Sequence, residues 1–406
     1  MSTAISHAVD PASVLGTSAR VVTEPASLGA AAEALRSFAD EKLAVIVVGG
    51  GTELELGLPP SRLDAVLRTR RLSRIVEYAP SDQIVAVEAG MTLEALQREL
   101  AGNGQRLALD PPLPDRATVG GIVAANSFGP LRARFGGVRD LVIGITVVRA
   151  DGVVARGGGK VVKNVAGFDL PRLFCGSLGT LGLIAEIIFR LHPLPETAAT
   201  LVFDGLSAGE VRALVRSAGE ARLEPVAVVG LSAGNRYRLA LRFEGFAPGV
   251  REQAERLLRI AGRPGDWLDS GTAAALWSRH DELRTAGDLR LKVSFAPASL
   301  ESVDAALRPL AAALENPALV LYPTLGCAFL SGGLADVPGA AAAIGSLRAM
   351  VRTANGSAVI LAAPPPLRAL VDVWGPSPSA IAVMRRLKAQ LDPDSRLSPG
   401  RFVGGI

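Results

Sequence analysis

Three glycine-rich segments in the first half of the chain constrain its fold more than any other feature. Gly49-Gly50-Gly51-Thr52 follows the apolar run at 43–48, ATVGGIVAANSFG occupies 117–129, and GSLGTLG occupies 176–182. Glycines after a strand let backbone N–H groups approach an anion closely, which suits them to phosphate. One such segment could be an empty tight turn, and the small residues at 117–129 could be core packing. Together the three segments predict one large cofactor that carries two phosphates.

The first glycine segment fits neither common nucleotide fingerprint. A P-loop needs Gly-Lys-Ser/Thr after the glycines, and none follows. A Rossmann fingerprint needs a small residue where Leu54 stands, and an acidic residue about 20 positions further on, where Leu-Arg-Thr-Arg at 67–70 offers none. The open alternatives are a tight turn without a ligand and a phosphate-binding turn of another fold.

The cysteine and histidine content limits the redox chemistry that the chain can perform by itself. Its two cysteines, Cys175 and Cys327, can form neither a disulfide framework nor an iron–sulfur site of four cysteines. The three histidines, His7, His192 and His280, lie far apart and lack the spacing of a metal site. We therefore expect no metal, and any redox activity requires an organic cofactor.

The composition also argues against nucleic-acid binding and against a membrane-spanning role. The formal net charge is +4 and aromatic residues make up 4% of the chain, which is too few for base-stacking platforms. No apolar run is long enough to cross a bilayer, and the N-terminal segment lacks the pattern of a signal peptide. We expect a cytoplasmic protein, with any peripheral membrane association made through partners.

The second half of the chain alternates strands and helices in a pattern that occurs twice. We expect strands at 199–204, 226–231, 236–243, 289–295, 318–323 and 326–330, with helices at 208–221, 249–261, 299–314 and 338–354. The repeated β-α-β-β-α order predicts a duplicated split-βαβ arrangement on an antiparallel sheet.

The order of the motifs resembles that of a known family. GGGT, TVGG, AANSFG, KNVAGFDLPRLFCGSLGTLGLIAEI and the C-terminal DPDSRLSPGRF are similar to motifs of the PCMH or vanillyl-alcohol-oxidase-type FAD-binding flavoproteins, and most of all to the FAD-binding subunits of glycolate oxidase. The resemblance implies an α+β fold with four parts. They are a mobile tail at 1–20, a two-part FAD-binding domain at 21–195, an α/β cap domain at 196–375, and a C-terminal helix and tail at 376–406 that pack on the FAD domain.

The resemblance also implies which residues bind the cofactor. The turn at 49–52 would hold the FAD pyrophosphate. Asp110 and Pro111 would belong to a segment that runs past the flavin, and the strand with Gly182 and Ile184 would contact the adenine end. The complete implied set is Gly49, Gly50, Gly51, Thr52, Asp110, Pro111, Thr118, Gly120, Gly121, Ala125, Asn126, Gly129, Gly167, Gly182 and Ile184.

Departures from the family pattern shape the functional prediction. No histidine lies between His7 and His192, so we expect noncovalent FAD rather than a histidyl bond to it. Leu178 replaces the acidic residue of the family's GSEGTLG motif, and Ser398 replaces the asparagine before Pro-Gly. Catalytic relatives bind a metal through histidines and acidic residues, and His280 stands alone in the cap region.

The resulting prediction is an FAD-binding subunit of a multi-subunit glycolate or other 2-hydroxyacid dehydrogenase. Its implied partners are a catalytic flavoprotein subunit and an iron–sulfur subunit. The oxidation needs a base for the hydroxyl proton, a cation for the carboxylate and a flavin that accepts the hydride. A self-sufficient dehydrogenase would use His280 with Asp281, or Tyr322, as the proton acceptor. A non-catalytic assembly subunit with an empty flavin site is the third alternative.

Overall fold

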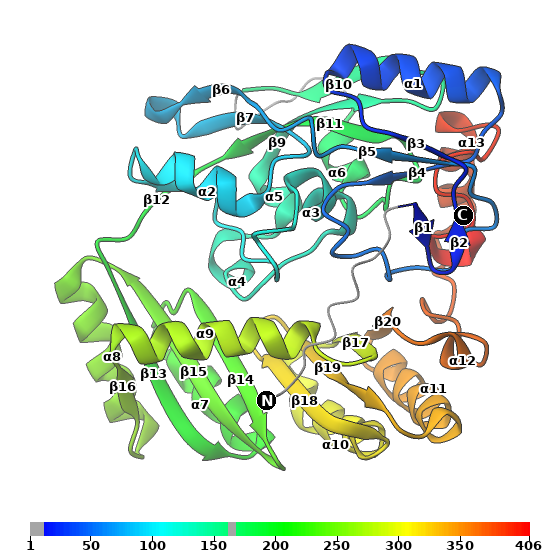
Figure 1. Ribbon diagram of the computed structural model, residues 1–406. Coiled ribbons are helices and arrows are strands. Elements are labelled where there is room, and N and C mark those ends of the chain that lie inside the picture. The colour runs from blue at the N-terminus through cyan, green and yellow to red at the C-terminus, as the bar shows by residue number, and fades with distance from the viewer. Residues whose placement is uncertain (1–11, 161–167) are drawn as a thin grey trace.

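The chain folds into two halves, which lie one above the other in the computed structural model (Figure 1). The structure describes residues 12–160 and 168–406, so the predicted cofactor residue Gly167 lies outside the described residues. The upper half contains the described residues from 12 to about 195 and the C-terminal helix, and the lower half contains the segment between them. We propose that the domain boundaries lie directly after residues 195 and 375, where the sequence analysis places them.

A small parallel sheet in the upper half carries the first glycine segment. Strands β3 (Val21–Thr23) and β4 (Val45–Val48) both pair in parallel with the central strand β5 (Ala65–Arg68). Helix α1 (Leu28–Asp40) connects β3 to β4 and buries one apolar face against the sheet. Because β4 and β5 run in the same direction, their carboxyl ends meet at one edge, where the glycine turn begins.

A five-stranded antiparallel sheet forms the rest of the upper half. Its strand order is β10-β9-β11-β7-β6, and helices α2, α3, α5 and α6 bury apolar side chains against it. The short strands β8 and β12 pair where the chain leaves for the lower half. The bounds are β6 (Ile75–Ala79), β7 (Ile84–Glu88), α2 (Leu93–Ala101), β8 (Gln105–Arg106), α3 (Val119–Ala125), α4 (Arg132–Phe135), α5 (Val138–Leu141), β9 (Val142–Val148), β10 (Val154–Gly158), α6 (Leu170–Phe174), β11 (Leu183–Arg190) and β12 (His192–Pro193).

The lower half is built on an eight-stranded antiparallel sheet that contains the predicted repeat. The first unit is β13 (Thr197–Leu206), α7 (Ala208–Glu220), β14 (Ala227–Ala233), β15 (Arg236–Gly245), α8 (Ala247–Ala261) and β16 (Asp266–Leu268). The second is β17 (Leu289–Ser294), α10 (Leu300–Ala312), β18 (Leu314–Tyr322), β19 (Cys327–Leu334), α11 (Val337–Thr353) and β20 (Ser357–Ala362). The order β16-β13-β15-β14-β18-β19-β17-β20 joins the two units edge to edge through β14 and β18. The predicted α+β class with a duplicated split-βαβ sheet is confirmed.

The two faces of this sheet have different neighbours. Helices α7, α8, α10 and α11 pack on one face over the large core of the lower half. Helix α9 (Ser270–Thr285), which separates the two units in the sequence, packs against β16, β18 and β19, and Leu276 of this helix clusters with Phe128 of the upper half. This second face is therefore turned toward the upper half, as Figure 1 shows.

The C-terminal segment returns to the upper half, as the resemblance implies. After α12 (Pro365–Arg368) and α13 (Ile381–Leu391), Leu397 forms a parallel bridge with Val45 of β4. Arg401 then donates hydrogen bonds to the carbonyl oxygens of Leu54 and Leu56, at 2.8 and 2.5 Å. The end of the chain thus fixes the loop that follows the glycine turn.

The prediction of a mobile tail at 1–20 is wrong for residues 12–20. Strands β1 (Ser13–Val14) and β2 (Thr17–Ser18) form an antiparallel hairpin, and Val14 is completely buried in a cluster with Ile46 and Val66. A single buried valine in a polar segment gives no periodic signal, so the sequence pattern could not reveal this contact. Residues 1–11 lie outside the described residues.

Candidate functional site

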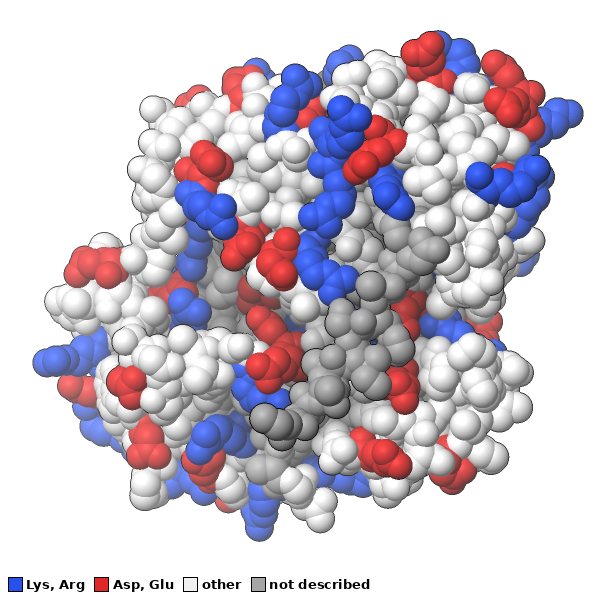
Figure 2. Space-filling view, viewed as in Figure 1, with Lys and Arg blue, Asp and Glu red and all other residues white. Residues whose placement is uncertain are grey.

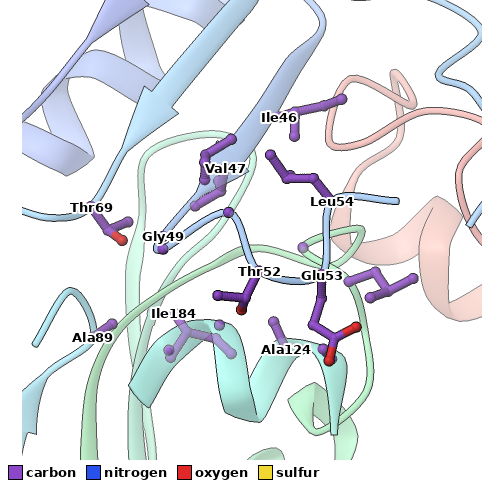
Figure 3. Close-up of a pocket in the computed structure, with 18 of the residues that line it drawn as sticks. Ile46, Val47, Gly49, Thr52, Glu53, Leu54, Thr69, Ala89, Ala124 and Ile184 are labelled. Atoms are coloured by element: carbon purple, nitrogen blue, oxygen red, sulfur yellow. The ribbon is translucent and has the colours of Figure 1, made fainter. Parts of the chain in front are cut away.

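All three glycine segments converge on one pocket in the upper half. It lies between the turn after β4, helix α3, and the loop that leads into β11. Figure 3 shows Thr52 and Glu53 on the side of the turn that faces Ala124 and Ile184. The lining residues are Ile46, Val47, Val48, Gly49, Gly50, Gly51, Thr52, Glu53, Leu54, Thr69, Ala89, Gly120, Gly121, Ala124, Ala125, Leu178, Gly179, Gly182, Ile184 and Arg401.

The glycine turn lies directly on the segment before α3, with no room for side chains between them. A Cβ atom on Gly50 would lie 1.8 Å from the carbonyl oxygen of Arg116, and one on Gly49 would lie 2.2 Å from Oγ1 of Thr118. Gly51 has φ +75, which glycine adopts without strain. The pocket wall is therefore bare backbone here, as close approach of a diphosphate requires.

The third glycine segment is held against α3 by backbone hydrogen bonds. Gly176 N donates to Val123 O and Leu178 N donates to Ala124 O, both at 2.9 Å. Gly179 has φ +71 and its backbone reaches the pocket. The three segments thus form one continuous site, and its glycine and alanine wall fits an extended ligand with phosphates better than empty tight turns.

Comparison with known proteins identifies the upper half. A family model described as "FAD binding domain" matches residues 19–158, which include β3 to β10 and the first two glycine segments. The chain contains an FAD-binding domain of the PCMH type. Its cofactor is FAD.

The chain is also similar to two curated glycolate oxidase subunits. The chain is 37% identical over 163 residues to "Glycolate oxidase subunit GlcD" of Bacillus subtilis. This match covers 40% of this chain and 35% of that protein. It is 32% identical over 226 residues to "Glycolate oxidase subunit GlcE" of Escherichia coli, which covers 55% and 63%. The matches thus span from about one third to just under two thirds of these relatives' length.

The complete fold also has a solved counterpart. The structure of alkyldihydroxyacetonephosphate synthase superposes with a TM-score of 0.71 at 16% identity, and it covers 94% of this chain and 77% of that one. Because 94% of this chain is covered, the likeness extends over both the upper and the lower half. At this identity the likeness concerns the fold alone.

The structure brings nine of the predicted cofactor residues together in the pocket of the FAD-binding domain. They are Gly49, Gly50, Gly51, Thr52, Gly120, Gly121, Ala125, Gly182 and Ile184. Five others do not line it: Thr118 and Asn126 cap the two ends of α3, and Asp110, Pro111 and Gly129 lie outside its lining. Their roles toward FAD remain predictions.

Several residues of the pocket were missed by sequence reasoning. Thr69 and Ala89 follow the carboxyl ends of β5 and β7, and Arg401 arrives from the C-terminal segment. Strand β5 was not predicted, so Thr69 had no structural context. Its signal is the short apolar run at 65–67 that ends in a polar residue, as strands beside a nucleotide site do.

Three cationic side chains gather around Phe128, between the FAD-binding domain and the lower sheet. The guanidinium of Arg132 lies 4.5 Å from the centre of the Phe128 ring and the ammonium of Lys292 lies 5.7 Å from it. Arg284 donates a hydrogen bond of 2.8 Å to the carbonyl oxygen of Phe128. Among residues 12–160 and 168–406, none of these three cations forms an ion pair. They form a cluster of cations without ion pairs, which we call the Phe128 cation cluster.

The Phe128 cation cluster adjoins the pocket of the FAD-binding domain through Glu53. The Glu53 carboxylate lines the pocket and accepts a hydrogen bond of 3.0 Å from the Ser127 hydroxyl. Burial lowers the pKa of Lys292, while Cys327 and Glu53 act in the opposite direction. Two carboxylates, those of Glu53 and Asp110, lie beside three cations, so the cluster is suited to an additional anionic ligand.

Asp110 is buried beside the same cluster. Burial raises its pKa to about 7, although its carboxylate accepts a 2.9 Å hydrogen bond from Leu131 N and is close to Arg284. The folded chain therefore binds a proton here that the unfolded chain releases near its ordinary pKa of 3.8. Stability contributed by the protonated form is thus lost as pH rises from about 4 to about 7.

We expect Asp110→Asn to be more stable than the parent chain at about pH 8 and to show a flatter pH profile. The rise in pKa corresponds to about 4 kcal/mol at most. Melting temperature between about pH 5 and pH 8 measures it, and Asp115→Asn, an exposed position nearby, is the control. If the melting temperatures of Asp110→Asn and of the parent chain change with pH in parallel, Asp110 does not hold an extra proton in the folded chain.

His280 and Tyr322 lie in the aromatic core behind this cluster. His280 is 2% exposed, its Nδ1 lies 2.9 Å from Oδ1 of Asp281, and its Nε2 lies 2.6 Å from the Tyr322 hydroxyl. Burial lowers the pKa of His280 and raises that of Tyr322. The two side chains are hydrogen-bonded to each other, and neither lines the pocket of the FAD-binding domain.

Two further findings concern metals and membranes. No group of three or more His, Cys, Asp or Glu side chains that could hold a metal ion occurs among the described residues. Within the same residues, no helix is both long enough and apolar enough to span a bilayer.

Proposed function

We propose that this chain holds FAD noncovalently as a subunit of an enzyme that oxidises a 2-hydroxy acid such as glycolate. The observation that carries the proposal is the convergence of the three glycine segments on one pocket of the FAD-binding domain. We further propose that the chain works with a catalytic flavoprotein subunit and an iron–sulfur subunit. The names of the two relatives, which describe each as a glycolate oxidase subunit, support an enzyme built from more than one subunit.

Noncovalent binding is supported by the chemistry of the pocket wall. No histidine, cysteine or tyrosine occurs among the described residues that line it. His192 instead packs edge-on against Phe135 at 4.9 Å, and His280 is hydrogen-bonded to Tyr322. A side chain able to form a bond to the flavin is therefore not in place in the described part of the pocket.

The residues of this chain divide into two roles in the proposed reaction. FAD, when bound, supplies the ring that accepts a hydride. The glycine turn and α3 would position its diphosphate through backbone N–H groups, and the Phe128 cation cluster would hold the carboxylate of the acid. The hydroxyl proton must be taken by another group, and the described residues beside the cluster offer only Glu53 and Asp110 as carboxylates.

A visible absorption spectrum of the purified full chain, before and after acid precipitation, tests the proposal. We expect a flavin spectrum whose chromophore leaves the precipitate and appears in the supernatant. A yellow precipitate would contradict noncovalent binding. A colourless, folded chain that takes up no added FAD would overturn the cofactor role and favour an assembly subunit.

The Phe128 cation cluster favours a second candidate, a chain that oxidises the acid by itself. This candidate predicts that glycolate or another 2-hydroxy acid bleaches the flavin of the purified chain without oxygen. Lys292→Gln would weaken substrate binding about 10- to 100-fold, which is the usual effect of losing a hydrogen bond to a charged group. The matched control is Lys160→Gln, whose exposed parent forms an ion pair with Glu77 away from the pocket. Failure of a broad panel of 2-hydroxy acids to bleach the flavin would exclude this candidate.

A further inference from the structure

A second cavity, of about 200 Å³, shares the glycine turn with the FAD pocket. Its wall includes Val48, Leu54 and the three glycines 49–51. The remaining lining residues are charged: Arg68, Arg70, Arg116 and Glu24. Three guanidinium groups and one carboxylate therefore surround the edge of the turn at which β5 ends.

The topology explains why arginines reach this cavity. Arg68 is the last residue of β5 and pairs with Val48, the last residue of β4, so both strands end at the same edge. Successive residues of an extended chain point to opposite sides. Accordingly Thr69 lines the FAD pocket, while Arg68 and Arg70 line the second cavity. Arg116 joins them because its backbone lies directly against Gly50.

These three arginines have no partners of their own. Across residues 12–160 and 168–406, none of their side chains forms an ion pair or a hydrogen bond, and the buried Nε of Arg68 has no acceptor. Like charges that share a small cavity repel one another, and a buried guanidinium nitrogen without an acceptor costs free energy. Both features indicate an anion that is supplied from outside the chain.

We propose that Arg68, Arg70 and Arg116 bind the diphosphate of FAD from the β5 side of the glycine turn. The inference rests on the proposed placement of the diphosphate at this turn. Guanidinium groups donate two parallel hydrogen bonds to phosphate oxygens and remain charged at every working pH. Backbone N–H groups would thus fix the position of the diphosphate, and the arginines would neutralise its charge. Figure 2 shows Lys and Arg side chains in a column on the upper half of the molecule, which reaches down toward its boundary with the lower half.

FAD titration of the flavin-free full chain tests this subsite. Arg70→Gln and Arg116→Gln are suitable because both parent side chains are exposed, so the fold should not depend on them. Each is expected to weaken FAD about tenfold, the usual effect of one hydrogen bond to a charged group, and the double variant about 100-fold. The double variant should also lose much of the salt dependence of binding, and ADP should compete less well by a similar factor. The matched control is Arg71→Gln, an exposed arginine next to the cavity that does not line it.

The possible results separate this inference from the proposed function. If the parent chain binds FAD and the double variant binds it equally well, the arginine subsite is wrong and the FAD role stands. If Arg71→Gln weakens FAD as much as Arg70→Gln does, the effect is general surface charge and the subsite is again wrong. If the parent chain binds neither FAD nor ADP, the proposed function and the subsite fail together.

Discussion

Replacing Gly121 with leucine is expected to weaken FAD binding about 100-fold while the chain keeps its stability. Gly121 lines the pocket from helix α3, and a Cβ atom there would meet only Oγ1 of Thr118, at 3.1 Å. The rest of the leucine side chain would extend into the space that FAD needs. Overpacking of this kind costs up to about 3 kcal/mol, so we expect FAD affinity to fall about 100-fold.

Stability should not suffer at this position, because glycine is a poor helix former. A leucine inside a helix is more favourable than glycine by about 0.8 kcal/mol. Thermal unfolding of the flavin-free chain should therefore occur at the same temperature or slightly higher. FAD titration and a thermal melt on the same sample measure both effects.

The neighbouring glycine is the matched contrast. A Cβ atom on Gly120 would lie 2.6 Å from Cβ of Ala89 and 2.8 Å from its carbonyl oxygen, so Gly120→Ala must displace backbone. We expect this variant to lose stability as well as FAD. If Gly121→Leu binds FAD with the affinity of the parent chain, the cofactor does not pass this wall, and the pocket has been assigned wrongly.

Periodic patterns predicted the regular elements well. Strand β15 at Arg236–Gly245 contains the predicted residues 236–243, and α10 at Leu300–Ala312 lies within the predicted range 299–314. Both have alternating or helical apolar stripes that are long enough to show a period. Strand β16, with three residues and two of them exposed, has no such stripe, and it was missed.

Helix α3 shows where composition misled the prediction. Residues 119–125 consist of two glycines and five alanine or β-branched residues, and no helix was predicted for them. The segment is helical because Thr118 caps it, accepting a hydrogen bond from Gly121 N at 3.3 Å, and because Val119, Ile122 and Val123 are buried. Tertiary burial outweighed the poor helix propensity of glycine.

The Phe128 cation cluster could not be predicted, for a different reason. Arg132, Arg284 and Lys292 come from three segments, and only the docking of α9 and β17 on the upper half brings them to Phe128. Sequence spacing carries no information on contacts of this range. The alternation Arg68-Thr69-Arg70 after an apolar run was a usable signal for the second cavity, and it required only that β5 be recognised.

A buried ion pair at the C-terminus carries the largest expected effect on stability. The Lys388 ammonium donates hydrogen bonds to Asp392 Oδ2 at 2.6 Å, to Leu397 O at 2.7 Å and to Thr180 O at 2.8 Å. Asp392 Oδ2 also accepts from Leu397 N at 2.7 Å, and its residue has no exposed surface. These bonds tie α13 and the bridge to β4 to the third glycine segment.

Asp392→Ala is therefore expected to lower the free energy of unfolding by about 3–5 kcal/mol, because it leaves the Lys388 charge buried without a counter-ion. Urea unfolding measures the loss, and the control is Asp394→Ala, an exposed position two residues further on. FAD affinity should also fall, since Thr180 belongs to the GSLGTLG segment whose Gly179 and Gly182 line the pocket.

The double variant Lys388→Met with Asp392→Leu decides whether charge or shape is responsible. Replacing both partners with apolar side chains removes the unpaired charge, so most of the lost stability should return. The hydrogen bond to Thr180 does not return, so FAD affinity should remain below that of the parent chain. Recovery of both properties would mean that the ion pair only fills space, whereas recovery of neither would mean that its hydrogen bonds alone hold the C-terminal segment on the FAD-binding domain.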